Sequence, residues 1–258
     1  MKRFLSLFLF MGSIFVYAEK AYYSGVQKFG FKTVVFNANG VASFDDVLSG
    51  EDDIWNQSFK YKFSEDGKFY ALTLENENQK KSFLALKSDF CLVLYDSETF
   101  ACRFFGMAIT PQQTETVYFP EEIKASSELK ENNTVYAAEN LSNVNSDSCW
   151  CEGVEGSGIG QSVRFSANAS SLIILTGYIS AKKKYLFEEN CRPKRITVNF
   201  TDIKKTETYN LLDSPNPQII DFKMNAPYSG VIEIIIDEVY EGTKYKDTCI
   251  SSIICKYL

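Results

Sequence analysis

Hydrophobic and polar residues alternate with a period of two in short segments along the N-terminal half of the chain. Ser58–Phe63 alternates in this way, Asp66-Gly67 supplies a turn signal, and Lys68–Leu74 resumes the apolar run. Because successive side chains of a strand point to opposite faces, this succession predicts a β-hairpin. Further strands are predicted at Lys32–Phe36, Ser82–Leu86, Phe90–Tyr95 and Phe100–Phe105. Together these segments predict a six-stranded meander, a small β-barrel or sandwich domain, over residues 19–108.

The strand pattern stops after residue 108 and resumes in the C-terminal half. The polar stretch predicts a linker over residues 109–121 and a second domain over residues 122–258. Strands of this half are predicted at Ser162–Phe165, Leu172–Leu175, Arg195–Phe200, Gln218–Phe222 and Val231–Tyr240. Val231–Ile236 is apolar almost throughout, as expected for a strand in the middle of a sandwich. Short strands at regular spacing, without a convincing helix, indicate an all-β protein whose second domain is a sandwich or jelly roll.

Residues 1–18 have the pattern of a secretory signal peptide. Lys2 and Arg3 form a basic end, an apolar run extends to Val16, and Ala18 ends a small-residue cleavage site. An uncleaved membrane anchor is the alternative, but the run is shorter than the roughly 20 residues that span a bilayer. No other segment of the sequence is long and apolar enough to span one. We therefore expect a protein that is exported to a secreted, periplasmic or cell-surface location.

Charge and composition exclude several classes of function. The net charge is −6, and removal of Lys2 and Arg3 makes it more negative, which disfavours binding to nucleic acid or anionic lipid. The sequence contains no histidine, which removes the commonest general base and the commonest metal ligand. We therefore expect no enzyme and no cofactor.

Seven cysteines in an exported chain suggest disulfides with one thiol left over. Cys91 and Cys102 would face each other, and could be bridged, if the turn between them centres on Asp96-Ser97. The spacing of Cys149 and Cys151, taken with Cys191, resembles part of a metal site. Without a histidine or a second close pair, we expect no metal there.

A set of loop motifs in the C-terminal half is more specific than any single strand. The motifs are Ala138-Glu-Asn-Leu141, Trp150-x-Glu152-Gly153, Gly158-Ile-Gly160, Gly177-Tyr178, Asn190-x-Arg192-Pro-Lys194 and Val239–Ser251. In this order they resemble discoidin-like domains, and in particular the glycan-binding domain of the NAD glycohydrolase translocation family, over about residues 122–257. The resemblance implies a galactose-binding-like jelly roll whose loops bind carbohydrate at one end. It does not imply NAD glycohydrolase activity, which belongs to a separate domain in such proteins.

The sequence departs from this family at positions that bear on ligands. Asn143 and Asn145 stand where many discoidin-like domains have carboxylates that hold calcium, and Ser252 stands where a late glutamate is common. Calcium prefers several anionic oxygen ligands, so we expect no tight calcium site. Thr176 and Cys191 replace asparagines of the family, which could alter the ligand preference.

Sugars present apolar C–H faces and fans of hydroxyl groups, which call for aromatic rings and for polar side chains that bond two neighbouring hydroxyls. The candidate ligand-binding residues are Trp150, Glu152, Tyr178, Asn190, Arg192, Tyr240, Tyr245 and Asp247. Each has an alternative role: the aromatic residues could belong to the core, and the charged ones could form an internal ion pair. The basic run Lys182–Lys184 could be a solvated loop or could contact anionic glycans.

These observations predict a non-catalytic carbohydrate-binding protein whose partner is a glycan or glycoconjugate. Two alternatives remain open. One is a structural module that docks an envelope or host surface protein without binding sugar. The other is a glycosidase that uses Glu152 and Asp247 as its paired carboxylates.

Overall fold

The computed structural model of the chain describes residues 21–25, 32–46, 54–107 and 116–257. Within these ranges the fold is all-β, as the alternation of apolar and polar positions predicts. The helical segments described are the single turn α1 (Leu186–Glu189) and 3₁₀ turns at Ala138–Ser142 and Thr201–Ile203. No helix in the described part of the chain is long and apolar enough to cross a membrane. The predicted signal peptide, residues 1–18, lies outside the described residues.

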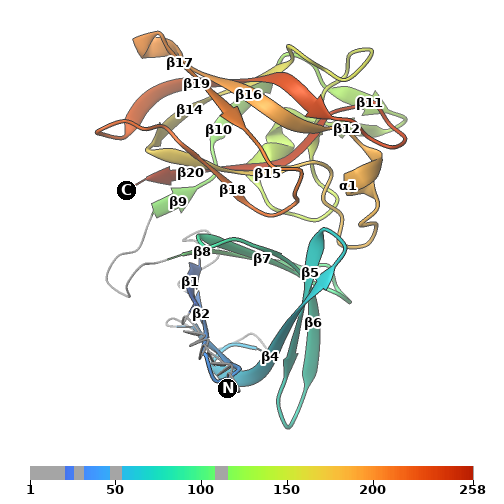
Figure 1. The fold of residues 1–258 in the computed structure, drawn as a ribbon, viewed down its shortest axis with the longest axis vertical. Coiled ribbons are helices and arrows are strands. Elements are labelled where there is room, and N and C mark those ends of the chain that lie inside the picture. Colours follow the sequence, from blue (N-terminus) through green and yellow to red (C-terminus); the bar gives the residue numbers. More distant parts are fainter. Residues whose placement is uncertain (1–20, 26–31, 47–53, 108–115, 258) are drawn as a thin grey trace, which may run out of the picture.

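Eight antiparallel strands form a closed barrel in the N-terminal half (Figure 1). They follow one another in chain order, and the last strand pairs with the first, which closes the barrel. The strands are β1 (Ala21–Gly25), β2 (Lys32–Phe36), β3 (Val41–Asp46), β4 (Gln57–Asp66), β5 (Phe69–Glu75), β6 (Lys80–Lys87), β7 (Cys91–Asp96) and β8 (Cys102–Met107). Leu92 and Leu94 of β7 belong to the barrel core. Val93, between them, points out of the barrel and joins a different cluster.

The structure selects the barrel from the two predicted forms of this domain and adds strands β1 and β3 to the predicted six. The predicted bridge between Cys91 and Cys102 is wrong in its register. β7 and β8 place Cys91 opposite Gly106, and both thiols are free. The turn lies further along the chain than expected, because the Asp96 carboxylate accepts hydrogen bonds of 2.8 Å from the backbone N–H groups two and three residues later.

The C-terminal half is a sandwich of two antiparallel sheets (Figure 1). One sheet has the order β10-β14-β19-β16-β17; the other has the order β13-β20-β15-β18, with β9 paired to β20. The strands are β9 (Thr116–Tyr118), β10 (Glu121–Ala125), β13 (Trp150–Cys151), β14 (Ser162–Ala169), β15 (Ser171–Thr176), β16 (Arg192–Phe200), β17 (Lys205–Asn210), β18 (Gln218–Asp221), β19 (Tyr228–Tyr240) and β20 (Cys249–Tyr257). A separate hairpin is formed by β11 (Leu129–Glu131) and β12 (Thr134–Tyr136). β19 lies between β14 and β16, so the central position predicted for Val231–Ile236 is confirmed.

Strand β15 is buried on both faces. Leu172 and Ile174 belong to the core between the two sheets. Ile173 and Leu175 point the other way, into an interface cluster that joins the sandwich to the outer face of the barrel. The interface cluster consists of Phe69, Leu84, Leu86, Cys91, Val93, Tyr95, Phe104, Val117, Phe119, Val144, Ile173, Leu175, Ile179, Phe187 and Ile254. This arrangement explains why the apolar run in β15 is continuous instead of alternating.

Candidate functional site

A cavity of about 190 Å³ lies at the end of the sandwich formed by α1, the β11–β12 hairpin and the loop between β19 and β20. It is lined by Leu129, Glu131, Tyr136, Cys151, Tyr178, Lys183, Leu186, Asn190, Tyr245 and Asp247. Four of the eight predicted binding residues are among them: Tyr178, Asn190, Tyr245 and Asp247. Residues far apart in the sequence are therefore brought to one place, as expected for loops that meet at one end of a jelly roll.

Two kinds of aromatic surface face this cavity. The Tyr245 side chain is 37% exposed, with the Lys244 ammonium 4.6 Å from its ring centroid. Tyr178 is half-buried and packs edge to face with Tyr136, their ring centroids 5.9 Å apart. Burial raises the pKa of the hydroxyl groups of both packed tyrosines, which stay neutral hydrogen-bonding groups. An exposed ring beside a fixed aromatic pair offers apolar surface to a sugar face.

The side chains of Asn190 and Asp247 both have unused hydrogen-bond acceptors in the cavity. The side-chain amide nitrogen of Asn190, the residue that follows α1, donates a 2.8 Å hydrogen bond to the carbonyl oxygen of Leu186, the first residue of α1. Within the described part of the chain, Oδ1 of Asn190 accepts no hydrogen bond. The Asp247 carboxylate likewise has no ion pair or hydrogen bond there, while its backbone carbonyl accepts the N–H of Cys191 at 3.0 Å. Both side chains therefore offer acceptors to a ligand without losing an internal bond.

Trp150 and Glu152 lie beneath this cavity and do not line it. The Trp150 ring is fully buried in the sandwich core, and its indole N–H donates to the carbonyl of Ser127 at 2.9 Å. The Glu152 carboxylate is also buried and accepts backbone hydrogen bonds from Val154 and Thr248, at 2.9 and 3.1 Å. Burial raises the pKa of Glu152, although these two bonds act in the opposite direction. Both residues hold the loops that carry the cavity.

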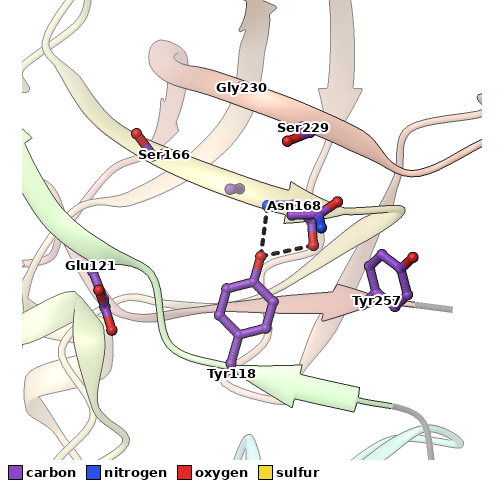
Figure 2. Close-up of a pocket in the computed structure, with 8 residues that line it drawn as sticks. Tyr118, Glu121, Ser166, Asn168, Ser229, Gly230 and Tyr257 are labelled. Carbon is purple, nitrogen blue, oxygen red and sulfur yellow. Dashed lines mark hydrogen bonds between the residues drawn. The ribbon is translucent and has the colours of Figure 1, made fainter.

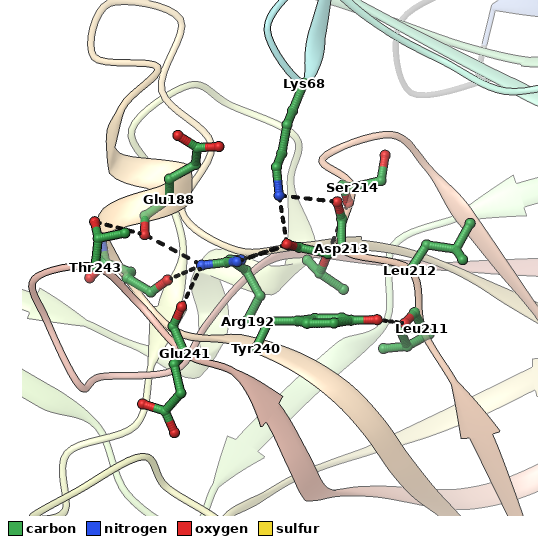
Figure 3. Close-up of polar contacts among 12 residues, drawn as sticks. Lys68, Glu188, Arg192, Leu211, Leu212, Asp213, Ser214, Tyr240, Glu241 and Thr243 are labelled. Carbon is green, nitrogen blue, oxygen red and sulfur yellow. Dashed lines mark hydrogen bonds and ion pairs between the residues drawn. The ribbon is translucent and has the colours of Figure 1, made fainter.

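The side chain of Arg192 is buried and lies at the centre of a polar network (Figure 3). Its guanidinium forms a two-armed ion pair with Asp213, with N–O distances of 2.9 and 3.0 Å. It also donates a 2.7 Å bond to the backbone carbonyl of Asn190 and stacks over Phe187. The internal ion pair considered for Arg192 therefore exists, with Asp213 as its partner.

Tyr240 pairs with Arg192 across β19 and β16 and also lies outside the cavity lining. Its hydroxyl donates to the carbonyl of Leu211 at 3.0 Å, a contact visible in Figure 3. The ring therefore helps to fix the segment between β17 and β18, which carries Asp213. Like Arg192, it acts on the cavity through other residues.

The lysines of the basic run Lys182–Lys184 lie in different environments. Lys183 lines the cavity, while Lys184 forms an ion pair with Asp66, the last residue of β4 in the barrel. Lys182 is exposed. One positive charge of the run is therefore placed where an anionic ligand could meet it.

In the loop that holds calcium in many discoidin-like domains, the side chain of Asn143 bonds to the loop itself. Oδ1 of Asn143 accepts the backbone N–H of Asn145 at 2.8 Å, and its amide nitrogen donates to Ser148 at 3.4 Å. Ser252, at the late position, is buried and bonds to the carbonyl of Leu141 at 3.5 Å. These groups shape the loop with neutral side chains.

Sequence reasoning missed the β11–β12 hairpin, which supplies one wall of the cavity through Leu129, Glu131 and Tyr136. The signal was present, because Asn132-Asn133 separates two short segments, and Asn132 takes a positive φ of 51°. Asparagine tolerates this conformation and is favoured in two-residue hairpin turns. Cys151 and Leu186, which also line the cavity, carry no such signal.

A second, more open cavity of about 710 Å³ lies near the C-terminal end of β20 (Figure 2). It is lined by Tyr118, Glu121, Ser166, Ala167, Asn168, Ser229, Gly230 and Tyr257. The Tyr118 hydroxyl bonds to the backbone N–H and C=O of Asn168, at 2.7 and 2.8 Å, so it ties β9 to β14. None of the predicted binding residues lies here.

The fold and the loop cavity together define a discoidin-like jelly roll joined to a β-barrel. The chain belongs to the family of the NAD glycohydrolase translocation F5/8 type C domain, whose family model matches residues 114–256. The resemblance inferred from the loop motifs is thereby confirmed. No curated protein matches the chain.

Solved structures with a similar fold include two carbohydrate-binding modules of Clostridium perfringens. The family 32 module of NanJ, solved in complex with galactose, is 16% identical and covers 55% of this chain and 99% of its own, with a TM-score of 0.40. The first family 32 module of a family 31 glycoside hydrolase is 12% identical and covers 54% and 96%, with a TM-score of 0.38. Allantoicase from Saccharomyces cerevisiae is 13% identical and covers 93% and 72%, with a TM-score of 0.36.

Proposed function

We propose that this chain is an exported, non-catalytic glycan-binding protein, and that its ligand binds in the loop cavity at the end of the sandwich. The observation that carries the proposal is the meeting of Tyr178, Asn190, Tyr245 and Asp247 in one cavity. The two aromatic rings supply apolar surface for the C–H face of a sugar. Asn190 and Asp247 supply acceptors, which the hydroxyl groups of a sugar need as donors.

The size of the cavity supports a short ligand. Its 190 Å³ is below the roughly 300–1,000 Å³ typical of clefts that hold drug-sized molecules. A terminal monosaccharide unit suits such a volume better than the interior of a long chain. Asp247 and Lys183 both line the cavity, so its electrostatic preference depends on which of them lies closer to the bound sugar.

The position of Glu152 supports a binding role over a catalytic one. A glycosidase needs two carboxyl groups that flank the scissile bond. Of the two carboxylates considered for this role, Asp247 lines the cavity, but Glu152 does not. Glu152 is buried, and each of its two carboxylate oxygens accepts a hydrogen bond from a backbone N–H group. The export of the protein rests on the leader-like sequence of residues 1–18.

The test is a glycan array probed with the purified chain, followed by titration of the best ligand into two tyrosine variants. Tyr245→Ala removes the exposed ring of the cavity and should abolish binding. Tyr257→Ala is the matched control, because Tyr257 is similarly exposed, at 39% against 37%, and lines the other cavity. Equal loss of binding in both variants, or an array without any ligand for the folded chain, would refute the proposal and favour the protein-docking alternative.

A further inference from the structure

Three cysteines from two distant segments meet directly behind the loop cavity. The sulfur atoms of Cys149, Cys151 and Cys249 all lie within 4.8 Å of one another. All three residues are buried, and they form a cluster of their own, with Leu129, Tyr136 and Tyr178 packed against it. The grouping expected from sequence spacing is different, because Cys191 stands elsewhere, within 4.0 Å of Glu241.

The backbone fixes this arrangement. Cys151 and Cys249 are directly opposite each other in the antiparallel pair β13–β20. Cys149 precedes Cys151 by two residues, and its sulfur lies 3.5 Å from that of Cys151. Side chains two residues apart in an extended segment share a face, so both sulfurs point toward Cys249. The three thiols therefore converge because of strand register and not through long flexible side chains.

The sulfur spacing suits a shared metal ion. With metal–sulfur bonds of about 2.3 Å, ligands of one trigonal or tetrahedral ion stand about 3.8–4.0 Å apart. The Cys149 and Cys151 sulfurs are 3.5 Å apart, slightly closer than this spacing, and no two of the three sulfurs are more than 4.8 Å apart. Structural zinc sites almost always take four protein ligands, whereas the group formed by the described residues contains three, all of them sulfur. Soft thiolate ligands select Cu(I), which does not require a fourth ligand.

We propose that Cys149, Cys151 and Cys249 form a binding site for a single Cu(I) ion, coordinated by three thiolate sulfurs. Binding transfers no electron: each sulfur that coordinates the ion releases its thiol proton to solvent.

The loop cavity gives the ion a route to this buried site. Cys151 belongs both to the cysteine cluster and to the cavity lining, so the cluster adjoins the cavity. Asp247 lines the same cavity and could carry a cation inward before the thiolates take it. The Cu(I) site stands independently of glycan binding, since none of its three ligands is a proposed sugar contact.

The test is anaerobic titration of the reduced full chain with Cu(I) in competition with a Cu(I) chelator. We expect one tightly bound equivalent, and X-ray absorption of the complex should show three sulfur neighbours. Cys249→Ser should weaken binding by more than the roughly 10–100-fold that loss of an outer-shell partner costs. Cys102→Ser and Cys255→Ser, which change thiols elsewhere, should bind as the unaltered chain does.

Several results would overturn the proposal. They are unchanged affinity in Cys249→Ser, a coordination shell without three sulfurs, or a disulfide between two of the three cysteines that peptide mapping finds in the chain as purified. Should Cys249→Ser fail to fold, the absorption measurement on the unaltered chain still decides. Binding of Cu(I) without any glycan binding would refute the proposed function and leave this site standing.

Discussion

Arg192 and Asp213 form a two-armed ion pair that supports the loop cavity from behind and also reaches the barrel. Both guanidinium contacts are within 3.0 Å, and the Arg192 side chain is almost fully buried. The same carboxylate accepts a 2.6 Å hydrogen bond from Lys68 of the barrel. One acidic group thus joins the segment that carries Asn190 to the other half of the protein (Figure 3).

Replacement of Asp213 should destabilise the fold. Asp213→Ala leaves the buried Arg192 charge without its partner, and breaking a buried pair in this way costs about 3–5 kcal/mol. We expect the lower end of that range, because Asp213 itself is partly exposed. The free energy of unfolding in urea measures the effect.

Two controls separate the members of this network. Lys68→Ala removes the partly exposed bond from Lys68 to Asp213, together with the contact of its ammonium with the Phe187 ring, and should cost no more than about 1 kcal/mol. Lys194→Ala breaks an exposed pair with Glu238 and should have an effect of similar or smaller size. If Asp213→Ala lowered the free energy of unfolding no more than Lys68→Ala and Lys194→Ala do, the ion pair between Arg192 and Asp213 would not stabilise the site.

Gly177 precedes Tyr178 and has a positive φ of 79°, with Phe187 and Arg192 close by. A Cβ atom here would lie 2.7 Å from the Phe187 ring and 2.8 Å from the Arg192 side chain. Gly177→Ala should therefore cost about 1–2 kcal/mol for the backbone conformation, and about 1–3 kcal/mol more for the overpacking.

Gly40→Ala is the matched control for Gly177→Ala. Gly40 has nearly the same φ, 81°, but nothing lies within 4 Å of its added Cβ atom. It should show the conformational cost alone, so the difference between the two variants in thermal or urea unfolding isolates the contact with Phe187 and Arg192. If Gly177→Ala and Gly40→Ala destabilised the fold equally, the close packing of Gly177 against Phe187 and Arg192 would not contribute to stability.

The alternation of apolar and polar residues predicts the strands that have one buried face, such as β4 and β16. It fails for β17, whose sequence Lys-Thr-Glu-Thr-Tyr-Asn is polar along both faces because the strand lies at a sheet edge. It also fails to reveal that the run in β15 is covered by the barrel on its second face. A continuous apolar run indicates burial on both sides but not what covers each side.

The loop motifs identify the four residues that meet in the cavity, because aromatic and polar residues at strand ends are typical of binding loops. The role of Arg192 could not be predicted in this way, since its partner Asp213 lies in a loop without any distinguishing motif. Cys249 lies within the Val239–Ser251 motif, but the motif does not show that β20 pairs with β13 and so places Cys249 opposite Cys151. Contacts between strands depend on sheet order, which sequence spacing does not contain.

The ionisation of Glu152 should make stability depend on pH. Burial raises its pKa in the folded state, so its contribution to stability is fully present below the unfolded pKa of about 4.3 and is lost as the pH rises through the folded value. The Glu152→Gln variant has no ionisable group at this position, so its stability lacks this pH dependence. The difference in the free energy of unfolding between the unaltered chain and the variant should therefore shrink from pH 4 to pH 7. Urea unfolding of both chains across this range measures it, and a penalty that grows with pH would contradict the assignment.

Asp247 provides the sharpest test of the proposed sugar contacts, because within the described part of the chain its carboxylate has no internal partner to lose. Asp247→Ala should leave the free energy of unfolding unchanged while it weakens glycan binding by about 1.5–3 kcal/mol, the contribution of a hydrogen bond to a charged group. Isothermal titration of the array-selected glycan gives the affinity. Asp89→Ala, at an exposed acidic residue of the barrel, should bind as tightly as the unaltered chain. Unchanged affinity in Asp247→Ala would place the sugar away from this carboxylate, and weaker binding together with lost stability would show that Asp247 supports the fold.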